Sequence, residues 1–275
     1  ILKKYKSFKF KLLDLKNYKK SYNEIKKIKP NCIYHLASQP GIMYSFKNPK
    51  TYRSNNIDVT MNLIKICKKI KPEKFYFTSS SSVYGNQKKY PLRENFKLLP
   101  INFYAKTKKE CEKFLQRQFK NTDIDLKIFR PFTVYGPYAR PDMLFISYLK
   151  KCEEKSIFSA YHYGEYVRDF TYVEDVAKIL CLFLKVPKIK KNIFNICSSK
   201  PKKIIQIIKI INKFVKKKCN LSLKPKRKGE MLTTYGDNKY LRKIIKFKKF
   251  TPIKIGIKKT VLWFYNYKDK RSFNF

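Results

Sequence analysis

A tyrosine and a lysine stand four positions apart in the segment Tyr104-Ala105-Lys106-Thr107-Lys108. On a helix this spacing places Tyr104 and Lys108 on one face, one turn apart. Because an ammonium beside a phenol favours the phenolate, we expect Lys108 to lower the pKa of Tyr104. Such a phenol can take the proton of an alcohol while hydride leaves the same carbon, so the pair indicates hydride-transfer chemistry.

A run of serines supports this interpretation of the pair. Tyrosine–lysine pairs at this spacing arise by chance in a chain so rich in lysine, so the pair alone is weak evidence. The run Ser79–Ser82, however, follows a segment rich in β-forming residues, and a single strand-to-helix connection separates it from Tyr104. A hydroxyl from this run, with Ser80 as the first candidate, would complete a proton relay with Tyr104.

The segments around these residues alternate between strand-like and helix-like patterns. Short apolar runs bounded by Pro, Asn or Ser predict strands, and apolar residues at helical spacing predict helices. The expected strands are 31–37, 74–79, 126–130 and 192–196, and the expected helices are 57–71, 104–119, 175–184 and 202–217. This order predicts an α/β fold with a doubly wound parallel sheet. Ligands of such sheets bind beyond the carboxyl ends of the strands, where the serine run falls.

The composition excludes several classes of protein. Lys+Arg is 65 and Asp+Glu is 19, a net charge of +46, but only nine of the basic residues are arginines and the lysines are spread along the chain. We therefore expect a solvated basic surface with weak, salt-dependent attraction to polyanions, and no specific nucleic-acid partner. No apolar run is long enough to predict a membrane span. The seven cysteines and two histidines are scattered, so we expect neither a metal site nor a disulfide framework.

Six segments together resemble one protein family. The chain is similar to the extended short-chain dehydrogenase/reductase superfamily, in its NAD-dependent epimerase/dehydratase family, and within it to UDP-glucuronate 4-epimerases. The resemblance covers residues 14 to about 240 in the family's order. It is carried by HLASQPGIMYSFKNP (35–49), SSSSVYG (79–85), YAKTK (104–108), RPFTVYGPYARPDM (130–143), VRDFTYVEDV (167–176) and KGEMLTTYGD (228–237).

The resemblance implies roles for individual residues. Tyr104 would be the catalytic base, Lys108 its partner and a ligand of the nicotinamide ribose, and Ser80 the hydroxyl that bonds both sugar and tyrosine, with Ser79 and Ser81 as alternatives. The other residues implied to contact NAD are Asp14 and Leu15 at the adenine, Leu36, Ala37 and Gln39 along the cleft, Asn56 behind it, and Ser79.

The same resemblance implies how a UDP-sugar would be held. Arg168 would grip the diphosphate and Asp237 a ribose or neighbouring group, while Arg140, Thr133 and Ser81 are candidates for sugar or carboxylate contact. Two purely structural alternatives stay open. In one, Arg168 and Asp169 form a surface ion pair, and in the other Asp14 is a turn or cap residue. Met43 stands where the family leads us to expect an arginine, which leaves one cation fewer for an acidic substrate.

A glycine-rich turn is absent from the sequence. The family begins with a strand and a G-x-x-G-x-x-G turn that cradles the cofactor's pyrophosphate, and none of the seven glycines forms such a cluster. Because the chain also begins with Ile, we expect about 50 residues of the family's fold to be missing ahead of it. We expect this chain alone to bind NAD poorly, and tight binding would contradict that.

The residues after Ser80 bear on the reaction. Dehydratases of the family resemble one another in an Asp-Glu pair there, and decarboxylases tend to carry a Glu, but Ser81 and Ser82 stand in this chain. The resemblance therefore implies a 4-epimerase, with UDP-glucuronate converted to UDP-galacturonate by oxidation and re-reduction at C4. UDP-glucose epimerisation and UDP-glucuronate decarboxylation remain alternatives. A non-catalytic basic binding protein with this fold is the rival from another class.

Domains, partners and location follow from the same resemblance. We expect a Rossmann-like NAD-binding domain from residues 1–137 and 167–197, incomplete at its N-terminus, and a smaller substrate domain from 138–166 and 198–275. The family implies a homodimer through a helix pair that includes Tyr104–Phe119. It also implies a cytoplasmic enzyme of surface-polysaccharide synthesis.

Overall fold

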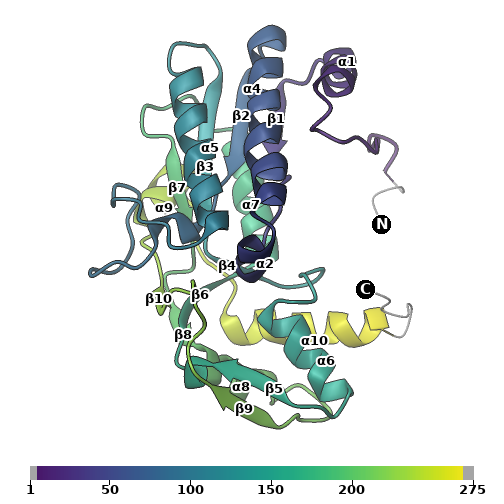
Figure 1. Ribbon diagram of the computed structural model, residues 1–275, viewed down its shortest axis with the longest axis vertical. Coiled ribbons are helices and arrows are strands. Elements are labelled where there is room, and N and C mark those ends of the chain that lie inside the picture. Colours follow the sequence, from purple (N-terminus) through teal and green to yellow (C-terminus); the bar gives the residue numbers. More distant parts are fainter. Residues whose placement is uncertain (1–4, 269–275) are drawn as a thin grey trace.

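The structure, a computed structural model that describes residues 5–268, is organised around a parallel sheet of four strands (Figure 1). The strands are ordered β1-β2-β3-β7, and every neighbouring pair is parallel. Six of the seven residues of β3 are buried, as expected of a central parallel strand with both faces covered. The bounds are β1 Cys32–His35, β2 Lys74–Thr78, β3 Asp125–Pro131 and β7 Ile193–Ile196.

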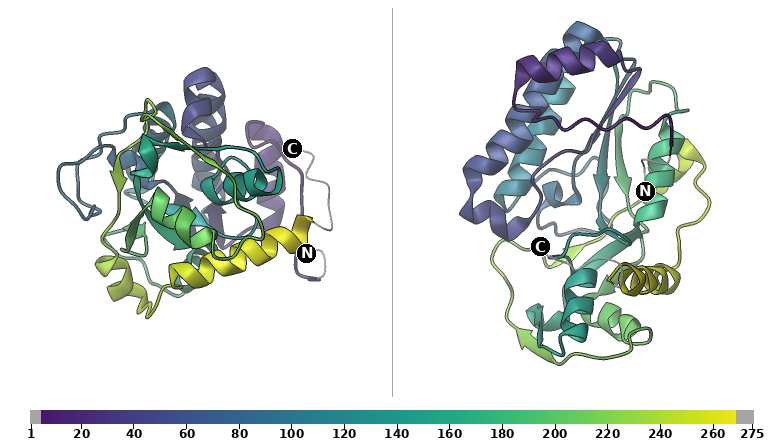
Figure 2. Two further views of the ribbon diagram at one scale, coloured as in Figure 1. Left: turned by 90° about the horizontal axis from the view of Figure 1, so that it is seen from below. Right: turned by 90° about the vertical axis from the view of Figure 1, so that its right-hand side faces the viewer.

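Helices cover both faces of this sheet, as Figure 2 shows from the side. Successive side chains of a strand point to opposite faces. Phe75 and Phe77 of β2 therefore pack with α4 and α5, whereas Tyr76 packs with α7 and α9. These helices span α4 Val59–Ile70, α5 Phe103–Phe119, α7 Val173–Phe183 and α9 Lys239–Ile245.

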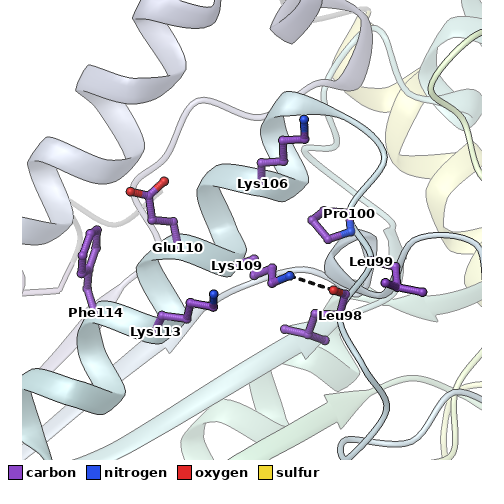
Figure 3. Close-up of a pocket in the computed structure, with 8 residues that line it drawn as sticks. All are labelled: Leu98, Leu99, Pro100, Lys106, Lys109, Glu110, Lys113 and Phe114. Carbon is purple, nitrogen blue, oxygen red and sulfur yellow. Dashed lines mark hydrogen bonds between the residues drawn. The ribbon is translucent and has the colours of Figure 1, made fainter.

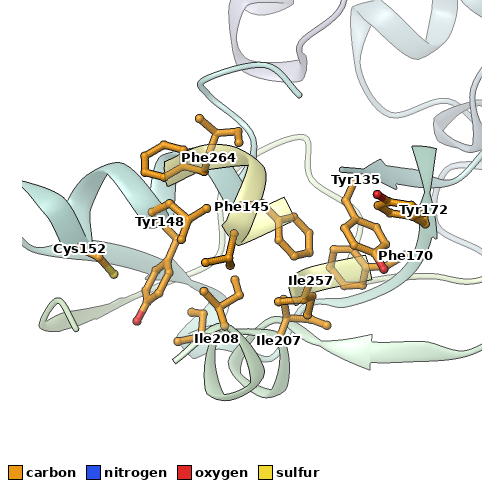
Figure 4. Close-up of a cluster of buried hydrophobic side chains, with 14 of the residues drawn as sticks. Tyr135, Phe145, Tyr148, Cys152, Phe170, Tyr172, Ile207, Ile208, Ile257 and Phe264 are labelled. Atoms are coloured by element: carbon orange, nitrogen blue, oxygen red, sulfur yellow. The ribbon is translucent and has the colours of Figure 1, made fainter. Parts of the chain in front are cut away.

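A second, smaller group of packed strands and helices, named the smaller layer system, lies below the carboxyl ends of the strands of the first sheet (Figure 1). Its strands form the order β10-β6-β4, with β8 antiparallel to β6, and a separate parallel pair β5-β9. Three helices pack around a core of aromatic and isoleucine side chains (Figure 4). The bounds are β4 Thr133–Tyr135, α6 Leu144–Glu153, β5 Phe158–Tyr161, β6 Val167–Tyr172, β8 Pro201–Lys203, α8 Ile204–Ile211, β9 Leu221–Lys224, β10 Thr233–Thr234 and α10 Ile253–Lys268.

Short elements complete the fold and connect it to the site. A π-helical turn leads directly into α4, and a 3-10 turn follows the serine run. The remaining bounds are α1 Tyr18–Ile28, α2 Ile42–Lys47, α3 Pro49–Tyr52, π-helix η2 Arg53–Asp58 and the 3-10 turns η3 Ser81–Tyr84 and η4 His162–Gly164.

The expected α/β class with a parallel sheet is confirmed, and all four expected strands are present. The helix expected over 202–217 is shorter at both ends, because residues 201–203 pair with β6 as β8 and the helix α8 already ends at Ile211. The expected domain division stays a prediction, and two sets of contacts cross it. β6, in segment 167–197, pairs with β8 of segment 198–275, and α9 of that second segment packs on β7.

The described residues show no membrane span and no metal cluster. Among residues 5–268, none of the helices is long and apolar enough to cross a bilayer. The same residues contain no group of three or more His, Cys, Asp or Glu side chains placed to hold a metal ion.

Candidate active site

Most of the sequence-predicted site residues line one cavity of about 1080 Å³ at the carboxyl ends of the strands. The wall is built by the segments that follow β1, β2 and β4, by the first turns of α5, and by β6 with the loop before β10. The sequence-predicted residues that line it are Leu36, Gln39, Ser79, Ser80, Ser81, Tyr104, Lys108, Thr133, Arg140 and Arg168.

The start of α5 fixes Tyr104 and Lys108. The side chain of Asn102 caps the helix by accepting a hydrogen bond from the Ala105 amide at 2.9 Å, so Tyr104 lies in the first turn and Lys108 one turn later. Both side chains line the cavity, as the spacing predicts. The ring of Tyr52 contacts the Tyr104 ring edge to face, with centroids 6.3 Å apart, which restricts its orientation.

Ser80 lies two residues after the end of β2 and caps the turn η3. Its Oγ accepts a hydrogen bond from the Ser82 amide at 3.2 Å. Burial raises the pKa of the Tyr104 phenol, while a hydrogen bond from the Ser80 hydroxyl and the charge of Arg140 oppose that rise. The net direction is upward, so the expected lowering of the Tyr104 pKa is wrong for this structure. The phenol is therefore protonated at neutral pH, hydrogen-bonded to Ser80.

Lys108 is directed at the end of β2. Its Nζ donates a hydrogen bond to the carbonyl oxygen of Thr78 at 2.8 Å and lies 4.8 Å from the centroid of the Phe77 ring. The side chain is buried, and burial lowers its pKa from 10.5 to about 8. The cation that opposes the rise of the Tyr104 pKa is accordingly Arg140 and not Lys108.

The lowered pKa of Lys108 gives a pH-dependent stability. Between pH 8 and 10.5 the unfolded chain holds this proton and the folded chain does not. Burial of the charged lysine therefore lowers the free energy of unfolding by its full amount below pH 8, and this loss becomes smaller as the pH rises. The stability gain of Lys108→Met over wild type should therefore shrink by about 2 kcal/mol between pH 7.5 and 10. Urea unfolding across this range tests it, with the exposed Lys106→Met as control. A gap that stays constant with pH would contradict the assignment.

Asn56 joins the loop after β1 to α5. This buried residue of η2 accepts a hydrogen bond from the Gln39 amide at 2.7 Å and donates to the Gln39 carbonyl at 3.2 Å and to Thr107 Oγ1 at 3.0 Å. A side-chain amide that satisfies both backbone groups of one residue fixes that residue's position. Asn56 thus lies behind the cavity wall and does not itself line it.

The residues at the open end of β1 are suited to a nicotinamide ribose. The buried Ser79 Oγ, in the cavity wall, has no hydrogen-bond partner, and a buried hydroxyl without one is costly unless a ligand supplies it. Leu36 and Ala37, at the end of β1, are exposed. Together with Lys108, these residues fit the nicotinamide end of NAD, whereas no glycine-rich turn for its pyrophosphate occurs in residues 5–268.

Asp14 and Leu15 lie outside the cavity wall. The Asp14 carboxylate accepts a hydrogen bond from the Lys16 amide at 3.0 Å, a turn-type contact, and lies 3.5 Å from the Lys16 ammonium. The Leu15 carbonyl accepts a hydrogen bond from Asn62 Nδ2 at 3.1 Å, which ties this segment to α4. The described structure therefore shows a turn at Asp14, and an adenine contact stays a prediction.

Two arginines and a glutamate meet on the other side of the cavity. Arg168 lies 3.9 Å and Arg227 3.7 Å from the Glu230 carboxylate, and all three side chains line the wall. Arg227 stacks on the ring of Tyr161 at 3.3 Å, and Arg168 lies 4.8 Å from the centroid of Tyr166. Two guanidiniums against one carboxylate leave an excess of positive charge, which suits a diphosphate. Sequence reasoning missed Arg227 and Glu230, although Glu230 lies within the segment KGEMLTTYGD.

The two aspartates near these arginines have other partners. Asp169 is fully buried and accepts hydrogen bonds from the Ser198 amide and hydroxyl and from the Ser199 and Gly236 amides, so it does not pair with Arg168. The alternative of a surface ion pair between Arg168 and Asp169 is therefore wrong. Asp237 is not among the cavity-lining residues. Its carboxylate lies 3.5 Å from Arg93 and accepts a hydrogen bond from the Lys239 amide.

Arg140 lies in the loop after β4 and acts on the end of the cavity that holds Tyr104. Its guanidinium forms a bidentate pair with Asp142, at 2.9 and 2.7 Å, and its charge acts on Tyr104. Thr133 and Met43 also line the cavity, and Met43 is 44% exposed. An arginine near the phenol is a candidate to hold an acidic group of a substrate there.

Comparisons with known proteins identify relatives of this chain. A model of the NAD dependent epimerase/dehydratase family matches residues 2–197. An uncharacterised protein of Methanocaldococcus jannaschii is 34% identical over 98% of this chain and 82% of its own length. The UDP-glucuronate 4-epimerase of Thermodesulfobacterium geofontis is 31% identical over 95% of this chain and 81% of its own length.

Solved structures agree with these sequence relatives. The crystal structure of UDP-glucuronic acid 4-epimerase from Bacillus cereus, in complex with UDP-glucuronic acid and NAD, superposes with a TM-score of 0.87. The two sequences are 30% identical, and the match covers 97% of this chain and 84% of that one.

Proposed function

This chain belongs to the NAD-dependent epimerase/dehydratase family, and from that membership we propose that it is an NAD-dependent nucleotide-sugar 4-epimerase acting on UDP-glucuronate. The observation that carries the proposal is the gathering of Tyr104, Ser80 and Lys108 in one cavity with Arg168 and Arg227. A base at one end and a diphosphate site at the other match the two ends of a nucleotide-linked sugar.

The reacting end moves a proton at the sugar C4 hydroxyl. The chemistry that NAD supplies when bound is reversible acceptance of hydride. Tyr104 takes the hydroxyl proton during oxidation and gives it back during reduction, and the Ser80 hydroxyl, hydrogen-bonded to the phenol, aligns the substrate oxygen with it. Burial raises the Tyr104 pKa and the charge of Arg140 opposes that rise, so further positive charge from the bound ligands must favour the phenolate in the loaded enzyme.

Epimerisation fits the cavity better than elimination does. Removal of water needs an acid/base carboxyl pair near the reacting carbon, and Ser81 and Ser82 stand after Ser80. The carboxylates that line the cavity are Asp142 and Glu230, and each lies against arginine. The hydrogen-bonded Arg140 guanidinium lowers the pKa of the Asp142 carboxyl, so this group is a poor general acid.

A uronate substrate places a second requirement on this site. Its 4-keto form is a β-keto acid, which loses CO₂ unless the carboxylate is restrained. We assign that restraint to Arg140 and Thr133, which line the cavity together with Tyr104. At the far end Arg168 and Arg227, which flank the Glu230 carboxylate, hold the diphosphate, and the contact of Asp237 with the nucleotide stays a prediction.

A homodimer is proposed through the outward face of α5 (Figure 3). A groove of about 750 Å³ runs between α5 and the loop before it, lined by Leu98, Leu99, Pro100, Lys106, Lys109, Glu110, Lys113 and Phe114. Leu99 is 43% exposed. In a two-fold dimer the same face meets itself, so Glu110 of one copy can oppose the lysines of the other.

A lysine introduced into this groove tests the dimer. Leu99→Lys adds a like charge to a self-complementary face, so we expect a dimeric wild-type protein and a monomeric variant. Light scattering or sedimentation velocity measures the mass. Leu262→Lys, a 52% exposed leucine on α10, is the matched control and should stay dimeric. A monomeric wild type, or a dimeric Leu99→Lys protein, would be evidence against the interface.

Product analysis by NMR tests the proposed reaction. Because none of the seven glycines forms a glycine-rich turn, the assay uses the chain itself and a fusion that carries the corresponding N-terminal segment of the Thermodesulfobacterium relative ahead of residue 1. With NAD and UDP-glucuronate, the fusion should yield UDP-galacturonate. A UDP-pentose would indicate a decarboxylase, a 4-keto-6-deoxy sugar from UDP-glucose a dehydratase, and turnover of UDP-glucose alone a different epimerase. A cytoplasmic role in surface-polysaccharide synthesis is proposed from the family only.

A further inference from the structure

We propose that Cys152 and Cys219 form a reversible disulfide, which makes this pair a modification site in the smaller layer system. Their sulfurs lie 3.6 Å apart although 67 positions separate them in the sequence. A disulfide bond is about 2.05 Å long, so the sulfurs need to approach by about 1.5 Å. The other five cysteines of the chain have no cysteine partner in the described structure.

The fold holds the two cysteines together from both sides. Cys152 lies in the last turn of α6, where it is buried beside Tyr148 in the core shown in Figure 4. Cys219 lies two residues before β9, and β9 pairs in parallel with β5. The Phe158 amide donates a hydrogen bond to the Asn220 carbonyl at 2.9 Å, which fixes the residue next to Cys219 against the segment that follows α6.

Accessibility differs between the two thiols and sets the order of the reaction. Cys219 is partly exposed, whereas Cys152 is fully buried. Burial and the neighbouring sulfur raise the pKa of Cys152. Cys219 is therefore the sulfur that an external reagent reaches first, and Cys152 is the resolving thiol.

The oxidant is a small disulfide such as oxidised glutathione. The Cys219 thiolate attacks one sulfur of this disulfide, its S–S bond breaks, and one glutathione leaves as a thiol once protonated. Cys152 then loses its proton and attacks the Cys219 sulfur, which expels the second glutathione. Two protein thiols are oxidised by two electrons, one glutathione disulfide is reduced to two thiols, and reduced dithiothreitol reverses the exchange.

The cross-link would join two elements that lead into the active-site cavity. Arg140 lies four residues before α6 begins, and Arg227 lies three residues after β9 ends. Closing a loop of this length restricts the unfolded chain strongly, so the oxidised protein should be the more stable form.

Peptide mapping after oxidation tests the proposal. The full chain is incubated with oxidised glutathione at pH 8.5, quenched in acid, alkylated and digested without reduction. We expect a linked peptide that contains Cys152 and Cys219, and a melting temperature higher by on the order of 5 °C that returns to its starting value with dithiothreitol. Cys181→Ser, which removes an exposed cysteine elsewhere, should keep both effects.

Two variants keep the proposal falsifiable. Cys219→Ser and Cys152→Ala should each abolish the linked peptide and the reversible rise in melting temperature. The proposal is overturned if Cys219 carries glutathione while Cys152 remains alkylatable, if oxidation links other cysteine pairs equally well, or if the melting temperature of the oxidised wild type does not rise.

Discussion

Replacement of Tyr104 by phenylalanine is expected to lower kcat by about 10²- to 10⁴-fold, the range that a positioned proton-transfer group contributes. The change removes the hydroxyl that bonds Ser80 and leaves the ring against Tyr52. The diphosphate contacts proposed for Arg168 and Arg227 are untouched, so binding of UDP should stay within a few-fold of wild type. Steady-state kinetics of the fusion protein and calorimetric titration with UDP measure the two effects.

A second tyrosine serves as the matched control for this experiment. Tyr163 is 55% exposed and lies outside the cavity wall, so Tyr163→Phe should retain wild-type kcat. Tyr104 is half-buried in the cavity wall, so loss of its hydroxyl should leave the free energy of unfolding within about 1 kcal/mol of wild type. Wild-type turnover by Tyr104→Phe would remove the proposed base from the mechanism.

Glu112→Gln is expected to lower the free energy of unfolding by about 3–5 kcal/mol, because it leaves a buried guanidinium without its counter-charge. Arg130 and Glu112 are both buried, and their bidentate contacts measure 2.9 and 2.6 Å. Nη1 of Arg130 donates to the Tyr84 hydroxyl at 3.0 Å and to the Glu94 carbonyl oxygen at 3.1 Å. The pair joins β3 to α5, one turn beyond Lys108, so its loss also disturbs the site. Urea unfolding measures the change.

An exposed ion pair is the control for the buried one. Lys151 and Glu154 lie 3.0 Å apart with side chains 40% and 54% exposed, so Glu154→Gln should leave the free energy of unfolding close to that of wild type. Replacing both buried partners by apolar residues, as in Glu112→Leu with Arg130→Met, should cost less than Glu112→Gln alone. A loss below about 1 kcal/mol for Glu112→Gln would show that the pair does not stabilise the fold as argued.

The elements that hold the site were predictable where local patterns are strong. The strand over 74–79 and the helix over 104–119 agree with β2 and α5, because each combines an apolar period with a clear stop or cap. The helix over 202–217 was overestimated at its start, because pairing of residues 201–203 with β6 is a long-range contact that the isoleucine pattern does not report.

The site's electrostatics depended on tertiary structure. Arg168 and Asp169 are neighbours on strand β6, and successive side chains of a strand point to opposite faces. This alternation is incompatible with an ion pair between the two side chains. Arg227 lies within the lysine-rich stretch 224–228, and only folding brings it to Glu230 and the cavity. The pKa of Tyr104 moved upward because burial of the phenol, which the sequence does not show, outweighs the groups that lower it.

The fate of the hydrogen at C4 tests the central claim most directly. The fusion protein is incubated with NAD and UDP-glucuronate in D₂O, and the product is examined by NMR. If Tyr104 exchanges only the hydroxyl proton while the carbon-bound hydrogen never enters solvent, UDP-galacturonate will form with protium at C4. Deuterium at C4, or no C4 epimer from a fusion protein that binds both NAD and UDP-glucuronate, would contradict the account.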